Sequence, residues 1–380
     1  MSTRTAAYPR RPMDFWLFGA TLILVVIGLL MVVDSSYIQE LNHNQAVFHF
    51  LSHQGTGALI GLAAMFVMMR VGYWRLREWA FPIMIIGMIL LIAVFIPHVG
   101  YHEGFATRWI GTRRIHFQPS EVAKFCLIIY VAKLLSMPRI KLNRGESAAL
   151  LWLGPPLAIT AIYLLLIERE PDMGTMVVLF LAVLTQLYLA GMRKRQLAII
   201  LGLTGVAAVL MISVFAHRSH RIETFLHPER DPQGVGFQVM HARLAVGSGA
   251  WFGMGWGRGR EKYYLPEANS DFVFATMAEE LGFVGLLPVL GLLVLVGIRG
   301  FVIAQSSRDR FGALLAGGLT ALISWQALIN MGVATASLPA TGVPLPFISY
   351  GSSSLVMLLA SVGVLLSIGQ HPAPPGQPAS

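Results

Sequence analysis

A single carboxylate holds the most chemically promising position of this sequence. Asp271 closes a long polar stretch, residues 217–271, and directly precedes an apolar run that begins FVFATMAEELGFVG. The stretch is rich in Arg, Lys and Gly, and its last cations are Arg258, Arg260 and Lys262. A carboxylate in such surroundings can take a proton from a hydroxyl group or hold a divalent cation. It can also cap the following helix, whose positive end favours the ionised form.

Two further pairs of ionisable residues lie inside apolar runs. Glu121 and Lys124 are three residues apart, so they share one face of a helix and can pair. Ionisable groups within a membrane span usually face the protein interior or a wet cavity. Glu121 and Lys124 are therefore either a structural ion pair or a polar cavity wall that contacts a substrate. Of Glu279 and Glu280, two turns beyond Asp271, one can be an interior hydrogen-bonding group and the other can point to the loop or to a partner.

The composition indicates that membrane helices position these groups. Of the 380 residues 55% are hydrophobic and 12% are charged, about half the charged fraction of a soluble domain. Apolar runs near the ~20 residues that span a bilayer lie at about 15–34, 54–71, 80–98, 119–137, 148–167, 173–191, 196–216, 272–298, 312–335 and 350–369. The sequence therefore predicts an all-α polytopic membrane protein with about ten spans.

The formal net charge of +9 reflects orientation and does not indicate nucleic-acid binding. The Arg and Lys residues lie in short turns between apolar runs, and alternate turns are rich in them, as the positive-inside tendency requires. This pattern places both termini, residues 1–14 and the Pro-rich tail 371–380, in the cytoplasm, and the loop 217–271 outside. We expect the tail to be disordered and residues 1–380 to form a single membrane domain.

One connection breaks this pattern. Residues 99–118 fall outside, although they contain Arg108, Arg113 and Arg114. An anionic ligand on the outer face would explain basic residues on that side. The remaining motifs exclude other classes: the sequence has no Walker motif, no HExxH and no Cys/His metal cluster, and GMGWGRG lacks the spacing of a nucleotide fingerprint. ATP-driven transport by this chain alone is thereby disfavoured.

Several stretches, in order, resemble one family of bacterial membrane proteins. RW at 108–109, FQPSEVAK at 117–124, EPDMGT at 170–175, LPEANSDFVFATMAEELGFVG at 265–285, QALIN at 326–330 and LPATGVPLPFISYGSSS at 338–354 are similar to the SEDS family of RodA, FtsW and SpoVE. The resemblance covers nearly the whole chain and leans toward the division-type FtsW member through QALIN and EELGFVG. The chain departs from the family pattern at Glu170, where the family has Gln, and at Ser352, where it has Gly.

The resemblance implies a ten-span glycosyltransferase that polymerises lipid II into peptidoglycan at the outer face of the bacterial inner membrane, in division or cell-shape maintenance. Asp271 matches the essential loop aspartate of the family, and Glu121 and Lys124 match its charged cavity pair. The resemblance also implies a divalent cation, Mg²⁺ or Mn²⁺, for which Asp271 is the candidate ligand. A class B penicillin-binding protein, which is a transpeptidase, is the expected protein partner.

The expected substrate carries a diphosphate, which cations of the outer loops would bind. The candidates are Arg108, Arg218, Arg221, Arg243, Arg258 and Lys262, with Glu280 as a further cavity residue. Two other functions remain open. A lipid II flippase would need charged groups reachable from both faces, and a non-catalytic scaffold for the transpeptidase would not need the carboxylate of Asp271.

Overall fold

The computed structural model describes residues 11–42, 49–103, 106–111, 116–137, 146–214, 223–231 and 234–371. Its helices are α1 (Phe15–Asn42), α2 (His49–Val71), α3 (Tyr73–Ala93), α4 (Pro119–Leu135), α5 (Glu146–Arg169), α6 (Met173–Leu189), α7 (Lys194–Val214), α9 (Val235–Gly249), α10 (Val273–Gln305), α11 (Arg310–Ala334) and α12 (Ser352–Gly369), with short 3₁₀ turns at Pro228–Arg230 and Glu261–Tyr263. The predicted all-α fold is confirmed.

The long helices coincide with the expected apolar runs. Within the described ranges, six of them are long and apolar enough to cross a membrane, which identifies a multi-pass membrane protein. The count of ten crossings stays a prediction. The third run, expected at 80–98, is shifted, because α3 already begins at Tyr73 after Gly72, whose φ of 82° separates it from α2. Its first turns carry Arg and Glu, so hydrophobicity alone misses this start.

Two features of the outer connections were not expected from the sequence. The 99–118 connection forms a small antiparallel sheet of β1 (Gly100–Glu103), β2 (Ala106–Gly111) and β3 (His116–Phe117), in the order β1-β2-β3. Tyr101 pairs with Trp109, and Ile110 pairs with Phe117. The large loop 217–271 contains α9. Both features give the outer loops a defined shape.

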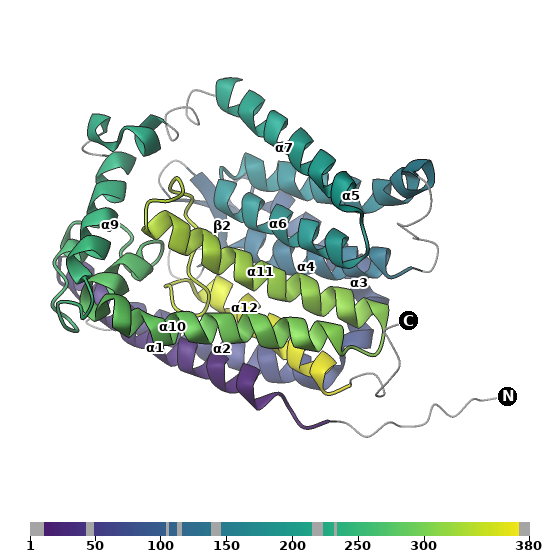
Figure 1. Ribbon diagram of the computed structural model, residues 1–380, viewed down its shortest axis with the longest axis horizontal. Coiled ribbons are helices and arrows are strands. Elements are labelled where there is room, and N and C mark those ends of the chain that lie inside the picture. The colour runs from purple at the N-terminus through teal and green to yellow at the C-terminus, as the bar shows by residue number, and fades with distance from the viewer. Residues whose placement is uncertain are drawn as a thin grey trace.

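The helices run roughly along one common axis, as Figure 1 shows. Helix α9 and the start of α10 lie at one end of this bundle, whereas the start of α1 and the end of α12 lie at the other. The backbone N–H of Arg11 donates to the carbonyl of Gln370 at 3.0 Å, which ties these two chain segments together. The expected outer loop and the expected cytoplasmic segments therefore lie at opposite ends.

The most extensive helix packing joins α2 and α12, and glycines lie at its contacts. A Cβ at Gly57 would lie 2.7 Å from Ser352 Cβ, and one at Gly61 would lie 2.6 Å from Leu359 Cδ1. On the facing helix, a Cβ at Gly363 would lie 2.3 Å from the carbonyl oxygen of Met65. Small residues four apart let helix backbones approach closely in a membrane, and the GxxxG spacing of Gly57 and Gly61 is the sequence signal for this contact.

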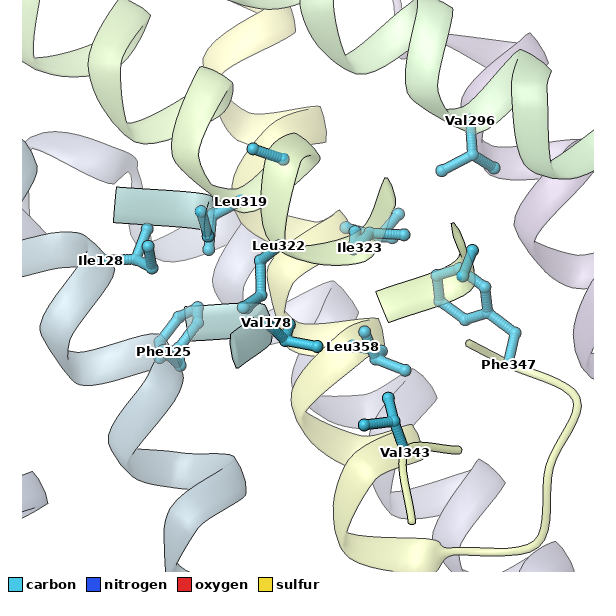
Figure 2. Close-up of a cluster of buried hydrophobic side chains, with 14 of the residues drawn as sticks. Phe125, Ile128, Val178, Val296, Leu319, Leu322, Ile323, Val343, Phe347 and Leu358 are labelled. Atoms are coloured by element: carbon cyan, nitrogen blue, oxygen red, sulfur yellow. The ribbon is translucent and has the colours of Figure 1, made fainter. Parts of the chain in front are cut away.

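The outer segment 338–351 folds back into the bundle core. Figure 2 shows Val343 and Phe347 of this segment in one buried cluster with Leu322 of α11 and Leu358 of α12. Both segment residues are nearly inaccessible, 4% and 2% exposed. An irregular backbone at this depth must have its polar groups satisfied by protein side chains.

Replacing Gly363 with Ala is expected to destabilise the protein. The added methyl group meets the backbone of Met65, which cannot move aside as a flexible side chain would. We expect a loss of about 1–3 kcal/mol, as for other overpacked cores, measured as a lower thermal unfolding temperature in detergent. The matched control is Gly291→Ala in α10, where a Cβ meets nothing within 4 Å. Equal unfolding temperatures for the two variants would contradict the proposed close contact.

Candidate active site

Asp271 lies in the turn before α10, and its carboxylate is partly exposed. Phe272 occupies the N-cap position of this helix, and no side chain caps it. The capping role predicted for Asp271 is therefore wrong. The carboxylate lies instead beside the 338–351 segment, where a Cβ at Gly342 would be 3.5 Å from Asp271 Oδ2 and 3.9 Å from Arg108 Nη1. The carboxylate and the guanidinium thus flank the same point.

Both charged groups line a cavity of about 170 Å³ at the end of the bundle where α9 and the start of α10 lie. Helices α9, α10 and α11 and the 338–351 segment supply the rest of its wall. The other lining residues are Val235, Gln238, Phe272, Val333, Ala340, Thr341 and Gly342. The Oγ1 atom of Thr341 is buried without a hydrogen-bond partner within the described part of the chain. The cavity therefore combines a carboxylate, a guanidinium and an unsatisfied hydroxyl.

Arg108 is held in place by backbone carbonyls. It extends from β2, and its Nε donates to the carbonyl of Glu170 at 3.0 Å, while Nη2 donates to the carbonyl of Pro171. The planar guanidinium can make two such bonds and still direct Nη1 toward the cavity, which a lysine ammonium cannot do in the same geometry. Arg108, which breaks the positive-inside pattern in the sequence, thus has a defined position opposite Asp271.

The backbone around Asp271 is held by polar side chains of neighbouring elements. Asn330 Nδ2 donates to the carbonyl of Asp271 at 2.9 Å and to that of Val343 at 2.7 Å. Ser349 Oγ donates to the carbonyl of Ser270 at 2.5 Å and accepts from the N–H of Leu345 at 2.7 Å. These bonds fix the turn of Asp271 against α11 and the 338–351 segment.

The 170–175 segment supports the floor of the site. Asp172 caps α6 by accepting from the N–H of Thr175 at 3.1 Å. It also accepts from Gln118 Nε2 at 3.0 Å, so the 117–124 and 170–175 motifs are joined. Glu170 is fully buried, and neither of its carboxylate oxygens has a hydrogen-bond partner among the residues that the structure describes.

The two carboxyl groups nearest Arg108 differ in their affinity for protons. Burial raises the pKa of Asp271 to about 7, the Glu267 carboxylate adds to this rise, and Arg108 opposes it. Burial raises the pKa of Glu170 to about 9, again with Arg108 in opposition. At neutral pH Glu170 is therefore protonated, whereas Asp271 is divided between its two forms. A carboxylate near neutrality is suited to proton transfer.

A second charged cluster, which includes Lys262 and Glu280, is buried, and its side chains bind one another. Lys262 Nζ donates to Asp34 Oδ1 at 2.8 Å and to Glu280 Oε1 at 2.7 Å, and all three side chains are at most 8% exposed. Glu280 also accepts from the N–H of Gly257 at 3.0 Å and from that of Gly259 at 3.1 Å. The structure thus places Lys262 and Glu280 in a cluster that joins α1 to α10 and does not bring them to Asp271.

The glycine-rich run around residue 255 wraps the start of α10. Glu279 accepts from the N–H of Arg260 at 2.7 Å, so both glutamates of the EE pair bind loop backbone. Gly282, with φ 67°, kinks α10 where a Cβ would lie 2.2 Å from Gly253 N. The glycines of this run therefore provide tight turns and close backbone packing.

Glu121 and Lys124 form a buried ion pair inside the bundle. Lys124 Nζ donates to Glu121 Oε1 at 2.8 Å and to Gln326 Oε1 at 3.2 Å, and both charged side chains are 3% exposed. They border a cavity of about 10 Å³, which is about enough for one water molecule. Gln326 in turn donates to the carbonyl of Pro344, which connects the pair to the 338–351 segment.

The remaining candidate cations are not in the Asp271 cavity. Arg243 and Arg258 are exposed on the outer loop. Arg218 and Arg221 lie outside the described residues, as do Arg113 and Arg114. Of the predicted site residues, the structure therefore brings Arg108 alone to Asp271 within the described ranges.

The sequence did not single out several residues that build this site. Asn330, Thr341 and Ser349 hold or line it, yet each has an unremarkable side chain in an apolar run or a Pro-rich loop. The available signal was a pair of amides, Gln326 and Asn330, four residues apart in α11. Side chains at that spacing share one helix face, and here both bind backbone of the 338–351 segment.

The described residues contain no group of three or more His, Cys, Asp or Glu side chains that could hold a metal ion. They therefore do not form a resident metal site of the usual protein type. Mg²⁺ is often bound by only one or two carboxylates together with substrate phosphates. Of these two kinds of site, the partly exposed Asp271 suits only the second, in which one or two carboxylates and the substrate phosphates bind the ion together.

Comparison with known proteins identifies the family. The model of the family described as "Cell cycle protein", which comprises FtsW, RodA and SpoVE, matches residues 15–373. This chain belongs to that family. It is 38% identical to stage V sporulation protein E of Bacillus subtilis (strain 168), over 94% of this chain and 97% of that protein. It is 36% identical to the probable peptidoglycan glycosyltransferase FtsW of Trichlorobacter lovleyi, over 94% of this chain and 95% of that protein.

Solved structures of the family share the fold. A structure described as "Structural coordination of polymerization and crosslinking by a peptidoglycan synthase complex" superposes with a TM-score of 0.76 at 26% identity, covering 94% of this chain and 97% of the other. The rod shape determining protein RodA of Thermus thermophilus superposes with a TM-score of 0.68 at 25% identity, covering 94% of this chain and 96% of the other. The predicted membership of the RodA, FtsW and SpoVE family is confirmed.

The raised pKa of Asp271 predicts how stability depends on pH. The folded state holds the proton up to a pH of about 7, whereas the unfolded chain releases it near 3.8, so ionisation of Asp271 lowers stability as the pH rises between these values. Asp271→Asn removes this loss. We expect the variant to unfold at a higher temperature than the wild type at pH 8, and the difference to vanish near pH 4. A difference independent of pH would contradict the raised pKa.

Proposed function

We propose that this family member is a peptidoglycan glycosyltransferase that polymerises lipid II into glycan strands. The observation that carries the proposal is the cavity in which Asp271, partly exposed and outside the closed clusters, faces the fixed guanidinium of Arg108. The relatives named peptidoglycan glycosyltransferase support the reaction class. A lipid-linked sugar diphosphate fits a site with one proton acceptor and one cation at the membrane surface.

In this mechanism Asp271 is the general base. Its carboxylate takes the proton of the sugar 4-hydroxyl of the acceptor, whose oxygen forms a bond to the anomeric carbon of the donor. The bond between that carbon and the diphosphate breaks, and undecaprenyl diphosphate leaves with the electron pair. Attack on an α-linked donor gives a β-linked product, so the anomeric centre is inverted and no covalent sugar–enzyme intermediate is required.

Arg108 stabilises the negative charge that develops on the leaving diphosphate. Its guanidinium is already oriented by the carbonyls of Glu170 and Pro171, so little reorganisation is needed during the reaction. Protonated Glu170 adds no negative charge beside it at neutral pH. In the alternative role Asp271 would hold a divalent cation, Mg²⁺ or Mn²⁺, which would supply further positive charge at the diphosphate.

The active site faces the outside of the bacterial inner membrane in this proposal. The Arg-rich turns and both chain termini lie in the cytoplasm, and the Asp271 cavity lies at the opposite end of the bundle. Glycan strands are then made on the side where the cell wall is built. The relatives named FtsW and SpoVE favour a division-type role over elongation.

A class B penicillin-binding protein is the proposed partner, because glycan strands must be crosslinked by a transpeptidase after polymerisation. The related solved complex couples polymerisation and crosslinking. Two alternatives are less well supported. A flippase must pass a disaccharide diphosphate between the helices, yet the cavity beside Glu121 and Lys124 holds about 10 Å³. A non-catalytic scaffold for the transpeptidase would not need the cavity that Asp271 and Arg108 line.

Replacing Asp271 with Asn is expected to abolish polymerisation. The amide keeps the shape of the side chain but cannot accept the hydroxyl proton, so the rate should fall by about 10²–10⁴. The assay follows glycan ladders on a gel, with purified protein, its transpeptidase, lipid II and a divalent cation. Wild-type activity should rise as the pH passes about 7, because the base must be ionised.

Glu229→Gln is the matched control, since this carboxylate is exposed in the same outer loop and pairs only with His227 among the described residues. It should retain full activity. Ladders of equal strength from Asp271→Asn and the wild type would overturn the assigned base. Lipid II movement without any polymer from the wild type would favour the flippase.

Replacing Arg108 with Lys is expected to lower the rate by about 10²-fold or more. Lysine keeps the charge but cannot bind the carbonyls of Glu170 and Pro171 while still facing the cavity. The initial rate of ladder formation at saturating lipid II measures the change. Arg230→Lys, an exposed arginine paired with Glu223, is the control and should be unaffected. A rate for Arg108→Lys equal to that of the control would exclude the assigned role.

A further inference from the structure

A second cavity, of about 280 Å³, lies at the other end of the bundle from Asp271. It is formed where the chain enters α1, where α2 ends and where α12 ends (Figure 1). Its lining residues are Arg11, Pro12, Met13, Met69, Arg70 and Gln370. Two arginines with two methionines give it a basic and an apolar side.

No carboxylate of the described residues neutralises the two arginines. Both are exposed, and neither forms a salt bridge within the described part of the chain. Two acids of this part of the chain are already engaged: Asp14 Oδ2 accepts from Arg299 Nη2 at 2.6 Å, and Asp309 Oδ1 accepts from Tyr73 at 2.7 Å. Among the described residues, the positive charge of the cavity is therefore uncompensated.

An apolar surface leads from this cavity along the bundle. On α2, Leu59, Phe66 and Val67 are 69%, 44% and 55% exposed, and Arg70 follows them on the same helix face. At the start of α1, Phe15 and Trp16 are each 69% exposed. Exposed apolar side chains that end in aromatic and basic residues are typical of a lipid-facing surface at the membrane–water interface.

The position of Arg70 at the end of a helix does not by itself explain why two arginines line this cavity. A cation in the last turn of α2 interacts favourably with the negative end of that helix. Arg11, however, precedes α1 and belongs to no helix, yet it lines the same cavity. Two cations around one hollow form a suitable site for a ligand with negative charge.

We propose that this cavity binds the phosphate headgroup of an anionic phospholipid from the cytoplasmic leaflet. Arg11 and Arg70 donate to the phosphate oxygens, and the acyl chains lie along the exposed face of α2. Bound lipid then joins α1, α2 and α12 at this end. The site is independent of glycosyl transfer and rests only on the orientation proposed above.

Native mass spectrometry of the purified full-length protein tests the site. The protein in detergent is titrated with dioleoylphosphatidylglycerol, with dioleoylphosphatidylcholine and with inorganic phosphate as a competitor. We expect the anionic lipid to bind more tightly than the zwitterionic one. Arg11→Gln and Arg70→Gln should each weaken its binding about fivefold and together about thirtyfold.

The matched control is Arg75→Gln, an exposed arginine in the first turn of α3 that does not line the cavity. It should leave lipid binding unchanged, and the unfolding temperature of each variant shows that it is folded. If the Arg70→Gln variant does not fold, the affinity of Arg11→Gln for the anionic lipid tests the site by itself. Equal affinity for the two lipids, or a double variant that binds like the wild type, would overturn the proposal. Displacement of the lipid by millimolar phosphate would identify a free-phosphate site instead.

Discussion

The hydrogen bonds of one buried amide hold the outer site together. Asn330 of α11 donates at once to the carbonyls of Asp271 and Val343, and so joins the turn of Asp271 to the 338–351 segment. One turn earlier on the same face, Gln326 binds the carbonyl of Pro344. Backbone carbonyls this deep in a membrane protein cost several kcal/mol if left unsatisfied, on the order of the penalty for burying any unpaired amide. Irregular backbone can therefore stay at the mouth of the bundle only while α11 supplies these donors.

The charged residues are of two kinds: some bind one another in a closed cluster, and others face an open cavity. Lys262, Asp34 and Glu280 bond to one another and to loop N–H groups, so they hold α1, α10 and the glycine-rich loop in register. Asp271 and Arg108 face an open cavity instead, and the hydroxyl of Thr341 beside them lacks a partner in the described chain. Buried networks that are complete give a protein rigidity, whereas open groups remain available to a ligand.

Helix α12 connects the two ends of the molecule. It begins directly after the SYG turn, where Gly351 N donates to Gln54 Oε1 at 3.0 Å, and it ends beside the cavity of Arg11 and Arg70. Along its length it packs closely on α2 through glycines on both helices. Because glycine contacts leave no room for adjustment, α2 and α12 form one stiff unit that spans from the end of the bundle near Asp271 to the cavity of Arg11 and Arg70.

The sequence alone determined the class, the membrane helices and the family, and it predicted a role for Asp271. These follow from local properties: long apolar runs and motifs that lie within a few residues. The tertiary structure decided which charges share a space. Arg108 reaches Asp271 although they are far apart in sequence, whereas Lys262 and Glu280, close to Asp271 in sequence, turn into a separate ion cluster. Spacing along a chain cannot predict these pairings, because they depend on how a small sheet, a kinked helix and a folded-back loop meet at one end of the bundle.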